Sequence, residues 1–103
     1  MGKLYKLTRD AENDLREVAR YTLSSWGAST LKTYRKGLVK TFNDLSGNES
    51  VGRYFSRRFP QLLVTRHRSH YIFYVVDAAE KPVVIGVTHE KRDIVNHLAE
   101  RLG

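Results

Sequence analysis

Hydrophobic positions in the first half of the chain recur at helical spacing. From about Arg9 to Trp26 an apolar residue returns every three or four positions, which predicts one amphipathic helix. The stripe consists of Ala11, Leu15, Val18, Ala19 and Thr22, and the polar residues Asp14, Arg16, Glu17 and Arg20 are expected to lie off it. Thr8 is a suitable N-cap, and Asp10 and Glu12 fall in the first turn, where carboxylates favour the positive end of the helix dipole.

A second helical stripe begins soon after Gly27, a residue type that commonly ends helices. Its apolar members are Leu31, Tyr34, Leu38, Phe42 and Leu45. Only a few residues separate the two stripes, which predicts an antiparallel helical hairpin whose shared apolar face must be covered by a sheet. Trp26, at the end of the first helix, is expected to pack against the rest of the protein.

The second half of the chain is rich in β-branched and aromatic residues, which predicts strands. The segments are Gln61–Thr65, His70–Asp77 and Val83–Thr88, and Lys3–Leu7 forms a further short strand before the first helix. Both faces of His70–Asp77 are apolar, so this strand is expected to be central and covered on both sides. Short connections favour antiparallel neighbours.

The end of the chain carries a weaker helical stripe, which predicts a short C-terminal helix. Its apolar members are Ile94, Val95, Leu98 and Leu102. A length of 103 residues is sufficient for one core and one domain, spanning residues 1–103. The expected fold is α+β: an N-terminal strand, an antiparallel α-helical hairpin packed on a small antiparallel sheet, and the C-terminal helix.

Composition excludes several classes of function. The chain has no cysteine, so disulfides, thiolate metal sites and thiol nucleophiles are excluded and a cytoplasmic location is expected. The longest apolar run, Tyr71–Val76, is far shorter than the roughly 20 residues that span a bilayer. Neither a phosphate-binding loop nor a two-histidine metal motif is present. We therefore expect no cofactor, no metal and no membrane partner.

Positive charge is concentrated in one segment. The formal net charge is +7, of which residues 51–70 contribute +5 because they contain five arginines and no carboxylate. These arginines are Arg53, Arg57, Arg58, Arg66 and Arg68. A planar guanidinium group suits phosphate and carboxylate partners, so the segment is interpreted as an interaction surface. The alternative is a solvated basic loop that keeps the protein soluble.

The order of these elements is similar to that of the RelE/ParE superfamily of toxins from type II toxin–antitoxin systems, and in detail to its ParE branch. Four segments carry the resemblance, in family order: Leu7–Leu15, Tyr21–Gly27 with Trp26-Gly27, His70–Tyr74, and Thr88–Ile94. The resemblance implies a toxin that is neutralised by a cognate acidic, ParD-like antitoxin in a hetero-oligomer. ParE toxins poison DNA gyrase by holding its cleaved DNA complex, whereas RelE toxins cleave messenger RNA on the ribosome.

The two branches require different sites. A gyrase poison acts by binding, and its candidate target-binding residues are Arg57, Arg58, Arg66 and Arg68. A metal-free nuclease needs a proton-transfer group beside cations, and its candidates here are His89, Arg66 and Arg68. A strand-end histidine bonded to the backbone is an equally simple interpretation of His89 and of His70. A third hypothesis is a non-toxic basic module that binds nucleic acid.

The antitoxin is expected to bind along the helical hairpin. A hairpin laid on a sheet leaves grooves on its flanks, and a basic domain with such a groove suits an acidic segment that folds on docking. The candidate antitoxin-binding residues are Lys32, Lys36, Lys40, Ile94 and Leu98.

Overall fold

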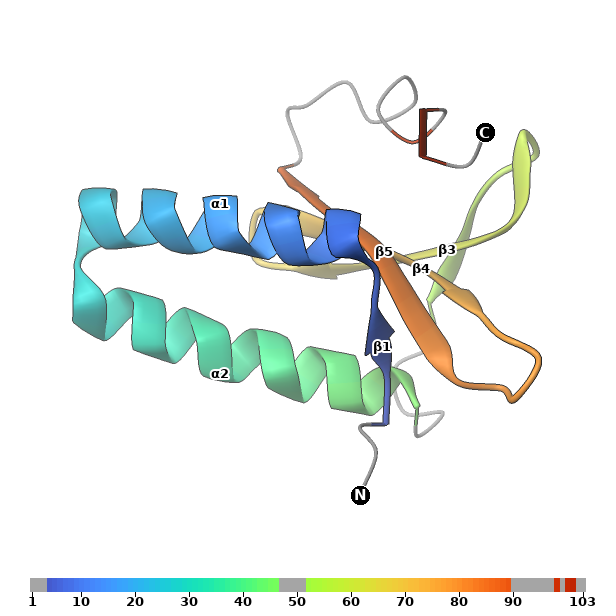
Figure 1. Ribbon diagram of the computed structural model, residues 1–103, viewed down its shortest axis with the longest axis horizontal. Helices are drawn as coiled ribbons and strands as arrows, with labels where there is room; N and C mark the ends of the chain where they lie inside the picture. The colour runs from blue at the N-terminus through green and yellow to red at the C-terminus, as the bar shows by residue number, and fades with distance from the viewer. Residues whose placement is uncertain (1–3, 47–51, 90–97, 99, 102–103) are drawn as a thin grey trace.

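Two long helices lie side by side over a sheet in the computed structural model, which describes residues 4–46, 52–89, 98, 100 and 101 (Figure 1). The elements, in chain order, are β1 (Lys6–Leu7), α1 (Arg9–Trp26), α2 (Ala28–Leu45), β2 (Arg53–Ser56), β3 (Phe59–His67), β4 (His70–Val76) and β5 (Pro82–His89). The α+β class and the helical hairpin packed on a sheet are confirmed.

Capping residues set the bounds of the hairpin. The Thr8 hydroxyl accepts a hydrogen bond from the Ala11 amide at 3.1 Å, which begins α1 as expected. Gly27 has φ of 92°, a value that favours glycine, and forms the link between the helices. Its amide donates to the Leu23 carbonyl at 3.0 Å, and its carbonyl accepts from the Leu31 amide at 3.1 Å. One residue therefore ends α1 and caps α2.

The sheet is mostly antiparallel, with the strand order β1-β5-β4-β3-β2. The one exception to the predicted antiparallel arrangement is β1, which pairs parallel with β5 through Lys6↔Val83 and Leu7↔Val84. Local pattern could not reveal this pair, because the five other described elements and their connections lie between its two strands and α1 follows β1 after one residue. The described part of the first strand is also short, at two residues.

The arginine-rich segment contains a strand that the sequence analysis missed. β2 pairs antiparallel with β3 through Arg53↔Val64 and Tyr54↔Leu63. β3 itself is longer than the predicted Gln61–Thr65, because it extends over nine residues to His67. The β-forming pair Tyr54 and Phe55 is too short to show an alternating pattern, and Arg53, Arg57 and Arg58 flank it. The segment is thus a hairpin built into the sheet.

Both faces of the sheet are covered by apolar clusters. Ile72 and Tyr74 on β4 are 0% and 3% exposed and pack toward the helices, whereas Phe73 is 0% exposed on the opposite face. The central position predicted for this strand is confirmed. The second cluster contains Leu62, Phe73, Ile85 and Leu98.

The predicted C-terminal helix falls mainly on residues outside the described part of the chain, Ile94, Val95 and Leu102 among them. The described residues of this segment, Leu98, Glu100 and Arg101, have helical backbone conformation. Leu98 is fully buried against the sheet face that lies away from the hairpin. Within the described residues, neither helix combines the length and the apolar character that a membrane span requires.

Asp14 differs from its expected position off the apolar stripe, since it is 6% exposed on the buried face of α1. Its carboxylate accepts from the Val87 amide at 2.9 Å and forms an ion pair with Arg101 at 2.7 Å. Gly86 leaves room for that guanidinium, because a side chain there would collide with it. The carboxylate is therefore a structural link between α1, β5 and the end of the chain.

Candidate interaction sites

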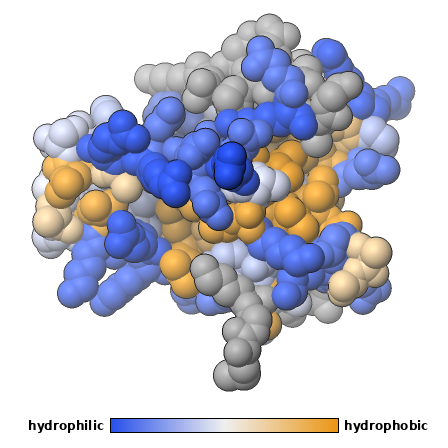
Figure 2. All heavy atoms as spheres, viewed as in Figure 1, coloured by the Kyte–Doolittle hydropathy of each residue, from blue (hydrophilic) through white to orange (hydrophobic). Residues whose placement is uncertain are grey.

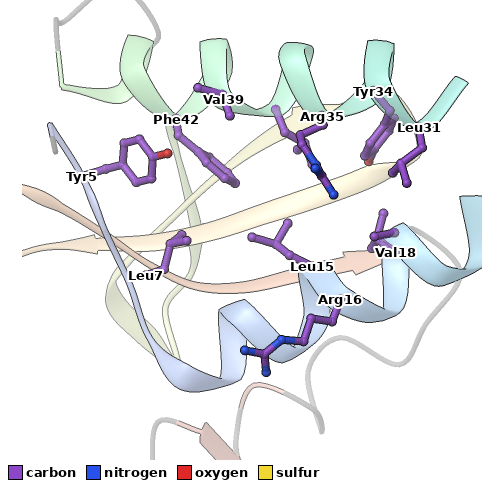
Figure 3. A pocket seen from close by; sticks show the side chains of 12 residues that line it. Tyr5, Leu7, Leu15, Arg16, Val18, Leu31, Tyr34, Arg35, Val39 and Phe42 are labelled. Carbon is purple, nitrogen blue, oxygen red and sulfur yellow. The ribbon is translucent and has the colours of Figure 1, made fainter. Parts of the chain in front are cut away.

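An apolar groove lies between α1 and α2 and is flanked at one end by β1 (Figure 3). Its volume is about 250 Å³. The lining residues are Tyr5, Leu7, Leu15, Arg16, Val18, Ala19, Leu31, Tyr34, Arg35, Leu38, Val39 and Phe42. Figure 2 shows apolar surface between the more polar surfaces of the two helices. The hairpin thus leaves part of its shared apolar face open to solvent.

Cationic side chains stand on both sides of this groove. Arg16 comes from α1 and Arg35 from α2, and both are exposed (Figure 3). Val39 adds an apolar surface that is 42% exposed. An apolar floor between cationic margins is complementary to an amphipathic segment with acidic flanks.

The predicted antitoxin-binding residues do not all lie at this groove. Lys32, Lys36 and Lys40 are exposed along one side of α2, next to Val39, and Lys40 pairs with Asp44 at 3.7 Å. Leu98 is buried on the other face of the sheet, and Ile94 lies outside the described residues. The three lysines are therefore exposed on α2 but are not among the residues that line the groove, and Leu98 lies elsewhere.

The tip of the hairpin exposes large apolar side chains. Trp26 is 69% exposed, Tyr21 66% and Leu23 50%. The expectation that Trp26 packs against the protein is wrong, because α1 continues past the edge of the sheet and leaves its last turn without a covering layer (Figure 1). Exposed Trp and Tyr are typical of residues that anchor protein interfaces.

The four predicted target-binding arginines form two groups. Arg57 and Arg58 occupy the turn between β2 and β3, whereas Arg66 lies one residue before the end of β3 and Arg68 lies in the turn to β4. The nine residues of β3 separate the groups by about 26 Å at about 3.3 Å per residue. Any partner that contacts all four arginines must therefore extend along β3.

One arginine group includes two residues that the sequence analysis did not assign to it. Arg53 opposes Val64, two positions from Arg66, and Arg66 opposes Tyr71. These side chains line a common depression with Val64 and Thr65. The Arg66 guanidinium carbon lies 5.6 Å from the centre of the Tyr71 ring. Only the pairing of β2 with β3 could bring Arg53 to this position.

Histidines and a tyrosine gather where α2 meets the sheet. The Tyr34 hydroxyl and His70 Nδ1 are hydrogen bonded at 2.6 Å. The Tyr34 ring contacts His67 edge-on, with centroids 5.0 Å apart, and the rings of His70 and His89 lie 5.5 Å apart. The sequence singled out His70 and His89 but not Tyr34, which it assigned to the apolar stripe.

Burial shifts the acid–base properties of this cluster. Burial raises the pKa of Tyr34 to about 12, and the positive charge of Arg68 opposes that shift. Burial lowers the pKa of His67, and Arg68 lowers it further. Both residues are therefore held neutral near pH 7, as expected for groups that pack rather than transfer protons.

The structure places two of the three nuclease candidates, His89 and Arg66, on different sides of the sheet, whereas the charge of Arg68 acts on Tyr34 and His67 of the histidine cluster. His89 shares a pocket with Glu17 and Tyr21 of α1, on the helix side of the sheet. Arg66 lies beside Tyr71, whose packing belongs to the opposite face. In the part of the chain that the structure describes, no three His, Asp or Glu residues are arranged to hold a metal ion.

The family model described as "ParE toxin of type II toxin-antitoxin system, parDE" matches residues 5–94. The chain belongs to this family of toxins.

Relatives agree with this assignment over nearly the whole chain. It is 37% identical over 98 residues to Toxin ParE of Escherichia coli, covering 95% of each chain. It is 26% identical to Toxin ParE1 of Mycobacterium tuberculosis (strain CDC 1551 / Oshkosh), covering 95% of this chain and 100% of that one. A solved structure titled "Chromosomal ParDE TA system from P. aeruginosa" has the same fold, with a TM-score of 0.67 and 17% identity over 84% of this chain and 96% of its own.

Proposed function

We propose that this toxin inhibits DNA gyrase by binding and stabilising its cleaved DNA complex. The observation that carries the proposal is the separation of His89 from Arg66 on opposite sides of the sheet. General acid–base catalysis needs the proton-transfer group within hydrogen-bonding reach of the reacting atoms. Binding requires only a complementary surface, and the arginines along the β2–β3 hairpin supply one.

A cognate antitoxin would neutralise the toxin by occupying the groove between α1 and α2. The apolar lining of the groove provides burial, and Arg16 and Arg35 provide positive charge at its margins. The occupant is an acidic amphipathic segment that orders as it docks. Membership of the parDE family supports the existence of such a partner.

The test of the target uses purified components. Gyrase, plasmid DNA and ATP are incubated with the toxin, and the products are treated with detergent and protease. The proposal predicts linear DNA that depends on both gyrase and toxin and decreases when the antitoxin is added first. Reactions without gyrase are the matched control.

Induction of the toxin in cells separates the remaining alternatives. Fragmented DNA, filamentation and an SOS response are the expected results. Rapid loss of translation with cleaved transcripts and intact DNA would instead establish a ribosome-dependent endonuclease. Unimpaired growth with soluble toxin would contradict both activities and favour a simple nucleic-acid-binding module.

A further inference from the structure

A depression of about 480 Å³ lies over β2, β3 and β4 and combines cations with an aromatic ring. Arg53, Arg66 and Tyr71 line it. Arg53 and Arg66 are diagonal neighbours across the β2–β3 pair, with side chains about 7–8 Å apart at their bases. Val64 and Tyr71 belong to the cluster on the face away from the helices, so this site is distinct from the antitoxin groove.

Arg66 is held in position before any ligand arrives. Its guanidinium carbon lies 5.6 Å from the Tyr71 ring centre, and its Nε donates to the Arg68 carbonyl at 2.6 Å. That carbonyl is presented by a turn in which Arg68 has φ of 54°. A positioned guanidinium loses less conformational freedom on binding than a mobile one.

The charge around the site selects an anionic ligand. Residues 51–70 contain five arginines and no carboxylate. Guanidinium groups bind phosphate bidentately, and aromatic rings beside them stack with bases. An acidic peptide would pair with the arginines but would have no base to stack on the flat surface of Tyr71 and Arg66. The combination therefore matches a phosphodiester chain with an unstacked base.

We propose that Arg53, Arg66 and Tyr71 form a binding site for single-stranded nucleic acid. The two arginines contact neighbouring phosphates, and a base stacks against Tyr71 and the Arg66 guanidinium. A duplex binds less well, because its bases are already stacked within the helix. This activity goes beyond gyrase binding and does not require gyrase. In a gyrase complex it would give the toxin a direct contact with an exposed DNA strand.

The experiment measures fluorescence anisotropy of a short labelled single-stranded DNA of mixed sequence with the full-length toxin. The same sequence as duplex DNA and as single-stranded RNA provides the comparison. Single-stranded DNA and RNA are expected to bind similarly, and the duplex at least about tenfold more weakly. The logarithm of the binding constant K should fall linearly with log[salt], with a slope of about −0.7 per phosphate contact.

Substitutions assign the binding to this site. Arg53→Gln with Arg66→Gln is expected to weaken binding at least about tenfold and to reduce the steepness of the salt slope by about 1.4. The matched control, Lys32→Gln with Lys36→Gln, removes the same charge from the hairpin and should change affinity less than about twofold. Tyr71→Leu keeps an apolar side chain but removes the ring, and should weaken binding about five- to a hundredfold. Far-ultraviolet circular dichroism confirms that each variant is folded.

Four results would overturn the proposal. Equal losses in the two glutamine pairs would show that net charge alone binds the oligonucleotide. Full retention of affinity in Tyr71→Leu, or equal affinity for the duplex, would exclude a stacked base. Displacement by an acidic peptide at lower concentrations than by unlabelled DNA would assign the site to a protein partner. The anisotropy experiment contains no gyrase, so it tests this site independently of the proposed function. If the toxin bound the oligonucleotide but failed to trap gyrase, only the proposed function would be refuted.

Discussion

The Arg101 guanidinium binds the Asp14 carboxylate through two hydrogen bonds, of 2.7 Å from Nη1 and 2.9 Å from Nη2. Nη1 also donates to the Ile85 carbonyl at 3.0 Å, and Asp14 accepts from the Val87 amide. The hydrogen bond to Asp14 is the main reason that the pKa of Arg101 is raised. This pair holds the end of the chain to α1 across the β5 strand.

Asp14→Asn is therefore expected to lower the free energy of unfolding by about 3–5 kcal/mol, because it removes the main counter-charge of a largely buried arginine. Asp10→Asn is the matched control. Asp10 lies 3.8 Å from the same guanidinium, but its side chain is 58% exposed, so its loss should cost less than about 1 kcal/mol. Urea unfolding followed by circular dichroism measures both, and equal midpoints would refute the role of the pair.

His67 should make stability fall in mild acid. Its pKa is lowered in the folded state by burial and by Arg68, so the unfolded chain binds a proton first as pH falls. The stability that neutral His67 contributes is fully present above about pH 6.5 and is lost as the pH falls toward the pKa that His67 has in the folded protein. Between about pH 7.5 and about pH 5.5 the free energy of unfolding should decline less steeply in His67→Gln than in the unmodified chain. Parallel pH profiles of the two proteins would contradict this assignment.

Charge reversal at the arginines should remove toxicity without unfolding the protein. The quadruple variant of Arg57, Arg58, Arg66 and Arg68 to Glu tests the whole surface, since surface substitutions usually change stability by less than about 0.5 kcal/mol. Of the two pairs, Arg66→Glu with Arg68→Glu should have the larger effect, because Arg66 is preorganised by Tyr71. The measurement is growth after induction without antitoxin, with Lys32→Glu and Lys36→Glu as the control. A soluble quadruple variant that still kills cells would disprove this.

His89→Ala should leave most of the toxicity intact. A binding protein has no single proton shuttle, whereas general acid–base catalysis contributes about 10²–10⁴-fold in rate. Growth after induction and gyrase trapping in vitro measure the effect in parallel. Loss of activity in a variant with native circular dichroism would favour the nuclease.

Apolar burial in the groove should supply most of the affinity for the antitoxin, and electrostatic attraction should raise the association rate. Raising the salt concentration is expected to slow association of the purified pair markedly and to change dissociation little, because exposed ion pairs contribute only about 0–1 kcal/mol each. Surface plasmon resonance gives both rates. A complex that dissociates at moderate salt would show that charge is the main source of affinity.

A substitution at the groove separates the contribution of apolar burial from that of charge. Val39→Asp places a carboxylate on an exposed apolar position of α2 and should speed dissociation at every salt concentration. Lys40→Ala, one residue along, removes a charge outside the groove and should mainly slow association. If both variants changed the same rate constant, the groove would not be the binding site.

The elements with strong local patterns were predictable from sequence. Helical spacing and the Thr8 cap located α1, Gly27 located the link to α2, and apolar residues on both faces identified β4 as central. β2 escaped prediction because its one apolar pair, Tyr54 and Phe55, is short and flanked by arginines. Its partner strand supplies the hydrogen bonds that make this segment a strand, and no local pattern records that pairing.

The sequence by itself determined the two amphipathic helices, the central strand and the concentration of arginine in residues 51–70, because these follow from spacing and composition along a short stretch of chain. Only the tertiary structure decided which residues meet. It placed Asp14 against Arg101, exposed Trp26, and divided the arginines along β3 while bringing Arg53 beside Arg66. Strand register, bulges and the reach of the hairpin beyond the sheet set these contacts, and each depends on residues that are distant in sequence.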